Sequence, residues 1–539
     1  MCLPSQRGVC MDIIRSLFQR KHATEREFQK IMQACSARML ELVQSVASYQ
    51  MEPQGIDRML LDYLAVESCA VEEFLDSANA QGNRYWYSYR RTVAFLKNFS
   101  QICHILISVQ ENTRRWELLE VPEKFAADTE DCLQSLRELL LAGCNYCILE
   151  AQKHHIYKEM PLVAMAAATG SPMSMKQTVI LPMTRRVRHE TKPSLTVIAL
   201  ATKFLRLSER NSLLDIYTQS QTVPSLVDLS PEVFTEEDVR LLQTHFHNMQ
   251  SMYDTFVYGS DISSQNPNIN VLYNHISLIL SLLESATLCV HYYQRHVHQK
   301  ISSCLLHELE IPNGMEILDK VVAYSLSYAD HFRKVGRSLC QDMLKQYAEP
   351  GSITVHVPNY RGFHVRPSTL IAKIVAHYGS DVTMKLDNVS YDAKMPLELF
   401  RANEELNAQK RRQIFSLLTQ NEIIHQHEEM PETFEQKRQV ARDVILDMFE
   451  KKQLVVYDTD FSFSDIADME NESYFEFVKR VMIRYMAMGK MDAQIDASVT
   501  FEGDKRVLQD IKILAENSYG EDIYGNNIVL PPELSYLRK

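Results

Sequence analysis

Residues 354–381 decide how the C-terminal part of the chain folds, and they spell TVHVPNYRGFHVRPSTLIAKIVAHYGSD. Just before and within this stretch, residues 352–357 alternate apolar and polar side chains, which predicts a strand. Residues 369–378 repeat apolar side chains at helical spacing, which predicts an amphipathic helix. His364 therefore lies between a strand and a helix, close to the N-terminus of the helix.

This position suits a phosphoryl group on an imidazole nitrogen. Free N–H groups of a first helical turn and the positive end of the helix dipole attract an anion. Arg366 adds a guanidinium that can donate to two phosphate oxygens, and Pro367 fits a turn where its missing N–H costs no hydrogen bond. Because nearby positive charge lowers the pKa of His364 from its usual value of about 6.5, we expect a neutral, nucleophilic imidazole. The candidate phosphate-binding residues are Val365, Arg366, Pro367 and Ser368.

The same stretch resembles the start of HPr, the histidine phosphocarrier family of the bacterial sugar phosphotransferase system. The motif of that family is Gly-Leu-His-x-Arg-Pro-Ala, between a β-strand and an amphipathic helix. The residues that match the motif are Gly362, His364, Arg366 and Pro367, and those that depart from it are Phe363, Val365 and Ser368. The resemblance implies that His364 is the phosphorylated histidine and that Arg366 contacts its phosphate.

The resemblance continues for a short distance along the chain. Residues 382–391 predict a hairpin with a turn at Asp387-Asn388. Residues 393–400 resemble the second helix of the family, whose apolar side chains dock the phosphoryl donor and the acceptors. Leu397 and Phe400 are the candidates for this docking role, and the alternative is that they are ordinary core residues.

The fourth strand and the last helix of an HPr fold do not follow directly. Residues 404–493 are charged and mostly helix-prone, whereas a strand and then a helix are predicted after them. We therefore expect a divided HPr-like domain, residues 351–403 with 494–523, interrupted by a helical insertion at 404–493 and followed by a tail at 524–539. A sheet without its fourth strand would expose an unpaired edge. The alternative is a truncated HPr-like unit followed by an unrelated small domain.

The N-terminal part of the chain is predicted to be almost entirely helical. Four long stretches keep apolar residues at helical spacing, which is typical of an antiparallel bundle. They are residues 26–49, 55–78, 86–114 and 125–159. We expect a helical bundle at 1–181 and a second helical region at 182–348, which begins with a basic linker. The predicted fold class is mainly α, with N-terminal helical bundles followed by an α+β domain of the HPr-like open-faced β-sandwich type.

Length and composition exclude several classes of protein. A chain of 539 residues needs more than one hydrophobic core, and a net charge of −12 argues against a general nucleic-acid binder. The longest apolar run, 271–290, contains His275 and Glu284, so we predict a buried helix and no membrane span. Eleven cysteines without a disulfide framework indicate a reduced, cytoplasmic compartment. Cys144 and Cys147 form a lone C-x-x-C, which does not predict a zinc site.

Histidines crowd one helical segment, at positions 291, 296, 298 and 307. No carboxylate stands at metal-ligand spacing among them, and no His-Glu-x-x-His occurs, so we predict neither a metal nor a cofactor. The sequence also lacks a Gly-rich nucleotide loop and a kinase motif. An enzyme with an active site in the bundles stays as a third hypothesis.

The leading hypothesis is a cytoplasmic phosphocarrier rather than a turnover enzyme. The resemblance implies that phosphoenolpyruvate-dependent enzyme I phosphorylates His364, and that an unknown protein accepts the phosphoryl group or responds to it. The long helical part favours a regulatory role. The rival hypothesis is an HPr-like binding scaffold that is never phosphorylated, since the fold is interrupted and Met395 stands where many relatives carry a regulatory serine.

Overall fold

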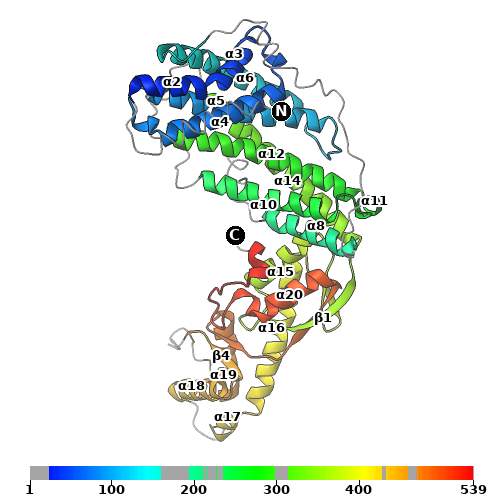
Figure 1. Ribbon diagram of the computed structural model, residues 1–539. Helices are drawn as coiled ribbons and strands as arrows, with labels where there is room; N and C mark the ends of the chain where they lie inside the picture. The colour runs from blue at the N-terminus through cyan, green and yellow to red at the C-terminus, as the bar shows by residue number, and fades with distance from the viewer. Residues whose placement is uncertain are drawn as a thin grey trace. The chain divides into compact units, whose positions relative to one another are not determined.

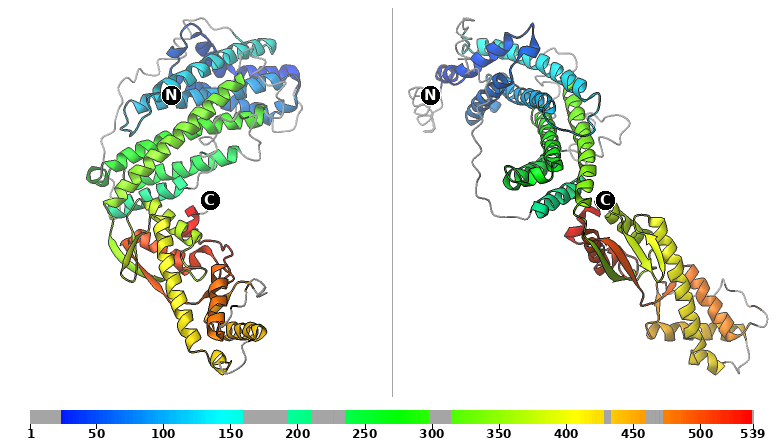
Figure 2. Two further views of the ribbon diagram at one scale, coloured as in Figure 1. Left: turned by 180° about the vertical axis from the view of Figure 1, so that it is seen from behind. Right: turned by 90° about the vertical axis from the view of Figure 1, so that its right-hand side faces the viewer.

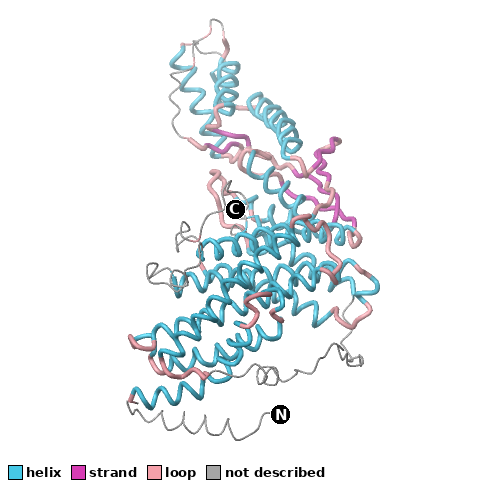
Figure 3. The backbone as a smooth tube through the Cα atoms, turned by 90° about the horizontal axis from the view of Figure 1, so that it is seen from above, coloured by secondary structure: helices cyan, strands magenta, loops and turns pink. Residues whose placement is uncertain are grey.

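The structure is a computed structural model that describes residues 24–158, 193–209, 214, 226, 235–297, 314–427, 433–458, 466, 469 and 472–537. It divides the chain into two compact units, residues 1–340 and 341–539. The described part of the first unit is helical, and the described strands belong to the second unit (Figures 1 and 3). This confirms a mainly helical chain with an α/β region near its C-terminus. The basic linker up to residue 192, His298 and His307 lie outside the described residues.

The first unit is a bundle of long helices with short ones between them. Its described helices are α2 (Glu25–Cys35), α3 (Ala37–Ala47), η1 (Pro53–Gly55), α4 (Arg58–Ser77), η2 (Ala80–Gly82), α5 (Tyr87–Thr113), α6 (Phe125–Lys153), α8 (Pro193–Glu209), α10 (Glu236–Phe256), α11 (Ile262–Gln265), α12 (Asn268–Tyr292), the π-helical turn η3 (Tyr293–Val297) and α14 (Gly314–Lys345), which ends within the second unit. Because α5 packs against α4, α6 and α12, helices from the two predicted regions, 1–181 and 182–348, belong to a single unit.

Aromatic side chains fill the contact between α5 and α12. Phe95 and Phe99 stack with ring centroids 4.2 Å apart, and Tyr292 meets Phe99 edge-on at 5.1 Å. A glycine lets α6 approach the same rings, since a Cβ atom at Gly143 would lie 2.1 Å from the Phe95 ring. These contacts explain why the long apolar stripes of the sequence become one bundle core.

Two described helical segments, residues 87–113 and 268–297, are long and apolar enough to cross a membrane. Of their most apolar windows, 78% and 72% are buried inside the bundle. Core helices of bundles have this character, and length with composition does not distinguish them from membrane spans. The absence of a membrane span stays a prediction.

The second unit is built on a four-stranded antiparallel sheet. Its strands are β1 (Pro350–His356), β2 (Thr383–Leu386), β3 (Val389–Asp392) and β6 (Ser498–Asp504), in the order β1-β6-β2-β3. Phe501 of β6 pairs with Ile353 of β1 on one side and with Met384 of β2 on the other. Helices α15 (Val365–Tyr378) and α20 (Lys505–Glu516) pack against each other, and α20 also packs on β1 and β6. A central strand of this sheet thus comes from beyond residues 404–493.

Helix α16 (Pro396–Thr419) connects the sheet with the intervening residues (Figure 2). The sequence suggested separate helices before and after residue 403, but the structure has one, because no proline or glycine interrupts it there. The elements that follow it are α17 (Glu422–His427), α18 (Phe434–Glu450), β4 (Leu454–Val456), α19 (Tyr474–Ala487) and β5 (Met491–Ala493). Strands β4 and β5 pair antiparallel, so the region predicted as a helical insertion also contains a small sheet.

The residues after α20 fold back onto the second unit. Glu521 and Asn527 form an isolated antiparallel bridge, and a short helix, η6 (Pro532–Leu537), follows. The Tyr536 hydroxyl donates a hydrogen bond of 2.8 Å to Asp510 on α20, and the Tyr536 ring stacks on His377 of α15 at 4.2 Å. Within the segment predicted as a tail, 524–539, the helix η6 is therefore packed against both α15 and α20.

Candidate functional site

A strained loop places His364 at the N-terminus of α15. His364 is the N-cap residue, with φ −77° and ψ −168°, whereas Arg361 and Gly362 before it have φ values of +50° and +63°. The side-chain amide of Asn403, on α16, donates to the carbonyl of Arg361 at 3.1 Å. A Cβ atom at position 362 would lie 2.2 Å from Asn403 Oδ1, so both the backbone and the packing favour glycine there.

A carboxylate from the C-terminal segment lies between the two charged residues of the motif. Glu521 Oε2 is 3.1 Å from Nε2 of His364, and Glu521 Oε1 is 3.8 Å from Nε of Arg366. The side chains of His364 and Glu521 are 20% and 8% exposed. Glu521 did not appear among the predicted site residues, because its position depends on how the chain folds back after α20. Its one sequence signal is the Gly520-Glu521 pair, which follows the helix predicted after residue 493.

Burial sets the protonation of this pair. It lowers the pKa of His364, and the positive charges of Arg361 and Lys410 lower it further. The predicted direction is confirmed, although burial rather than charge is the main cause. Burial also raises the pKa of the Glu521 carboxyl, which Arg366 partly offsets and Asp522 reinforces. Both shifts disfavour the charged forms, so His364 is a neutral imidazole near pH 7.

The two ring nitrogens of His364 have different surroundings. Nε2 faces the Glu521 carboxylate, so the proton of the neutral ring belongs there. Nδ1 then carries the lone pair. It has no hydrogen-bond partner among the described residues and is covered from solvent. The ring of Tyr360 meets His364 edge-on at 5.3 Å. A Cβ atom at Gly525 would lie 2.5 Å from the Tyr360 ring, so the chain around Gly525 packs against this tyrosine.

The four predicted phosphate-binding residues do not contribute equally. Pro367 has no N–H, and Ser368 is fully buried. The Ser368 amide donates to the carbonyl of His364 at 3.2 Å, and its hydroxyl donates to the carbonyl of Phe363 at 2.9 Å. The amides of Val365 and Arg366 have no acceptor in the part of the chain that the structure describes. Of residues 365–368, the structure thus leaves two amides and one guanidinium as donors for a phosphate, and phosphate binding itself stays a prediction.

The two predicted docking residues lie on the first turns of α16. The Leu397 residue is 70% exposed, so it is not a core residue, and Phe400 is partly buried. Met395, directly before the helix, is 50% exposed, and Val365 at the start of α15 is 66% exposed. The apolar side chains at these positions are accessible to a partner protein.

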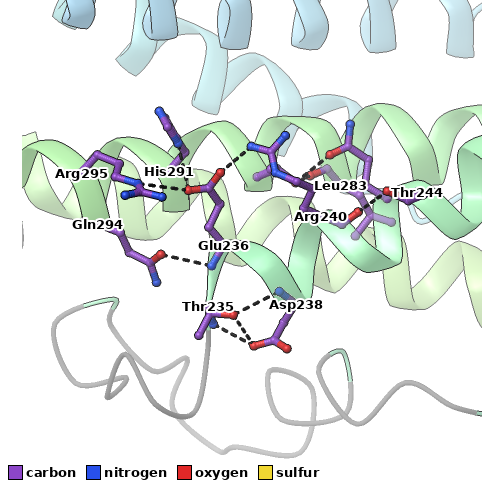
Figure 4. A network of polar contacts seen from close by, with 11 residues as sticks. Thr235, Glu236, Asp238, Arg240, Thr244, Leu283, His291, Gln294 and Arg295 are labelled. Carbon is purple, nitrogen blue, oxygen red and sulfur yellow. Dashed lines mark hydrogen bonds and ion pairs between the residues drawn. The ribbon is translucent and has the colours of Figure 1, made fainter.

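The histidine-rich segment of the first unit is part of an ion-pair network rather than a cluster of ligands (Figure 4). Nδ1 of His291 lies 2.9 Å from Glu236 Oε2, and Arg240 and Arg295 contact the same carboxylate. Burial alone would raise the pKa of Glu236, but the hydrogen bonds from Arg240 and His291 outweigh it and lower that pKa. His296 stacks on a tyrosine ring, and burial lowers its pKa to about 3.

The described residues include no group of three His, Cys, Asp or Glu side chains that could hold a metal ion. Cys144 and Cys147 are buried within α6, and burial raises the pKa of both thiols. Thiols in such surroundings stay protonated and unreactive.

Comparisons of the chain with protein-family models, with curated proteins and with solved structures found no match. The function of the site is therefore argued from its own geometry, together with the residues that resemble HPr.

Proposed function

We propose that the protein is an HPr-like phosphoacceptor of the cytoplasm, phosphorylated on His364 by an enzyme I-like donor and used for regulation. The observation that carries the proposal is the pairing of His364 with Glu521 at the N-terminus of α15. It presents a neutral imidazole whose Nε2 faces a carboxylate, and the other nitrogen keeps its lone pair. The strand order β1-β6-β2-β3, with α15 and α20 packed together, supports the open-faced sandwich of the HPr family.

The transfer exchanges one phosphorus–nitrogen bond for another. Nδ1 of His364 is covered in this structure, so the proposed transfer requires that the covering residues first move aside. Nδ1 then attacks the phosphorus of the donor's phosphohistidine, and the donor bond breaks with its electron pair returning to the donor nitrogen. Nε2 keeps its proton, so the ring becomes an N-phosphoryl imidazolium whose positive charge faces the Glu521 carboxylate. The proposed step involves no cofactor. An acceptor protein takes the phosphoryl group by the same exchange or responds to it.

The phosphoryl group, with roughly −1.5 to −2 charges, would then compete with Glu521 for Arg366. The free amides of Val365 and Arg366 are the nearest main-chain donors on α15. Like charges on Glu521 and the phosphoryl group repel. The segment that carries Glu521 is thus the part of the second unit that responds to phosphorylation, which gives the regulatory use a physical basis.

The second candidate function is a binding scaffold that is never phosphorylated. It is favoured by the covered Nδ1 of His364 and by the carboxylate already placed beside Arg366. In that case Glu521 replaces a phosphoryl group as the anion beside Arg366. Leu397 and Phe400 would then serve partner binding alone.

Labelling separates the two candidates. We expect the full chain, incubated with enzyme I and radioactive phosphoenolpyruvate, to gain an acid-labile, alkali-stable phosphate. His364→Ala abolishes the label, and His356→Ala, which alters an exposed histidine on β1, leaves it unchanged. Phosphoramidate, a small chemical donor, tests the acceptor without protein docking. No label from either donor establishes the scaffold instead, and equal label on His364→Ala rules out His364 as the phosphoacceptor.

A further inference from the structure

A pocket of about 380 Å³ opens beside His364. Arg361 and His364 line it from the loop before α15 and the start of that helix, and Asn407 and Arg411 line it from α16. Its far wall is formed by the end of α19 and by β5. The pocket therefore joins the candidate histidine to the inserted region, and neither part forms it alone.

The charges that face this pocket do not balance. Asp492 is its one acidic lining residue, and that carboxylate is already paired with the buried Lys410 at 2.5 Å. Arg361 donates through Nη2 to the carbonyl of Gly489 at 2.6 Å, which fixes its guanidinium at the pocket edge. Arg411 is exposed and has no carboxylate within ion-pair distance among the described residues. Neither guanidinium is paired with a carboxylate among the described residues, so Arg411 and the remaining N–H groups of Arg361 can receive an anion.

The opposite wall is apolar. Ile483, Met486 and Met491 line it, and a second pocket of about 320 Å³ continues past Ile483 and Met486 toward Phe415. Arg411 lines both pockets. A ligand that satisfies both walls has an anionic end and an apolar body.

We propose that this pocket binds a small organic phosphate monoester. The pocket offers more donors than one carboxylate can accept: the guanidinium of Arg411, the side-chain amide of Asn407, and the N–H groups of Arg361 and Asn403 that are not used for backbone carbonyls. The three terminal oxygens and the two negative charges of a phosphate monoester match them. The apolar wall holds the organic group. This inference goes beyond the proposed function, because it does not require that His364 is ever phosphorylated.

Calorimetric titration of the unphosphorylated full chain tests the inference with phenyl phosphate, inorganic phosphate and phenol. We expect phenyl phosphate to bind more tightly than the other two, and its affinity to fall as salt rises. Arg411→Gln weakens binding of phenyl phosphate by about tenfold or more. Arg401→Gln is the matched control, since Arg401 is an exposed arginine on the same helix, faces Glu398 at 2.9 Å and lines neither pocket.

Three results would overturn the inference: no binding of phenyl phosphate, equal affinity in the two arginine variants, or phenol or inorganic phosphate binding as tightly as phenyl phosphate. Circular dichroism checks that both variants are folded. We expect them to be folded because both arginines are exposed. Because the titration uses unphosphorylated protein, its failure and the failure of the labelling experiment are separate outcomes.

Discussion

Glu521 Oε2 lies 3.1 Å from Nε2 of His364, and the same carboxylate reaches toward Arg366. A phosphoryl group on His364 would compete for that arginine, so we expect phosphorylation to loosen the turn that carries Glu521. Amide hydrogen exchange should speed up at Asp522, Gly525 and Ile528, whose N–H groups are bonded within the turn.

Exchange measured by mass spectrometry on phosphorylated and unphosphorylated protein checks this prediction. Peptides from α5 in the first unit serve as the internal control. In Glu521→Gln, which removes the negative charge, the phosphorylation-dependent difference should shrink. Unchanged exchange in the turn of the native chain would contradict the regulatory part of the proposal.

The protonation of His364 gives a second prediction. Burial and the charges of Arg361 and Lys410 lower its pKa, so the ring stays neutral as pH falls through 6.5 and gains a proton only below that value. The unfolded chain binds this proton first, so the stability contributed by neutral His364 is lost as pH falls below about 6.5.

Nuclear magnetic resonance of histidine-labelled protein measures the titration midpoint, with His364→Ala to assign the signal. We expect a midpoint below about 6.5, and a rise toward that value in Arg361→Gln because one positive charge is removed. A midpoint above 6.5 would mean that the Glu521 carboxylate outweighs burial.

The sequence predicted the elements around His364 well, because the evidence for them is local. The strand before it, the helix after it and the hairpin at 382–391 each follow a short periodic pattern. The strand at 498–504 also has a period-two pattern, although its partners lie more than a hundred residues earlier. Local patterns could not predict that Glu521 lies beside His364, because the two residues are far apart in the sequence.

Other features could not be predicted either, because they depend on contacts between segments that are distant in the sequence. Strands β4 and β5 have three residues each, too few for a periodic pattern, and they exist because they pair with each other. The arginine pocket combines the loop before α15 with α16 and α19. Ser368 looked free to bind phosphate, but its hydroxyl is used by the carbonyl of Phe363.

The loop before His364 gives a third prediction. Gly362→Ala places a Cβ atom 2.2 Å from Asn403 Oδ1 at a φ of +63°, so we expect a loss of roughly 1 to 3 kcal/mol in the free energy of unfolding. Urea unfolding of the second unit measures it. Gly351→Ala is the control, because position 351 has no positive φ and its Cβ atom would come close only to the Lys505 side chain, at 2.7 Å, with Leu508 at an ordinary 3.6 Å. Adding Asn403→Ala should relieve the steric part of the cost, and equal losses in both glycine variants would contradict this account.

Docking of the donor gives a fourth prediction. Leu397 is 70% exposed on the first turn of α16, so Leu397→Glu should leave folding unchanged. Docking of the donor would bury Leu397, and a position buried in an interface does not tolerate a new charge. We therefore expect labelling by enzyme I to slow by about tenfold or more. Labelling by phosphoramidate should be unaffected, since that donor needs no protein contact. Equal slowing with both donors would place Leu397 outside any docking surface.

The ion pair between Lys410 and Asp492 gives the last prediction. Their side chains are 3% and 10% exposed, and they join α16 to β5 at the wall of the pocket beside His364, which Asp492 lines. Lys410→Met leaves the carboxylate buried without a partner, which costs about 3 to 5 kcal/mol in the free energy of unfolding. The double variant Lys410→Met with Asp492→Leu should recover most of that loss, because no buried charge remains. Lys505→Met is the control: it breaks an exposed pair with Glu349 and should change stability little. If the double variant is no more stable than Lys410→Met, the ion pair is not what holds β5 against α16.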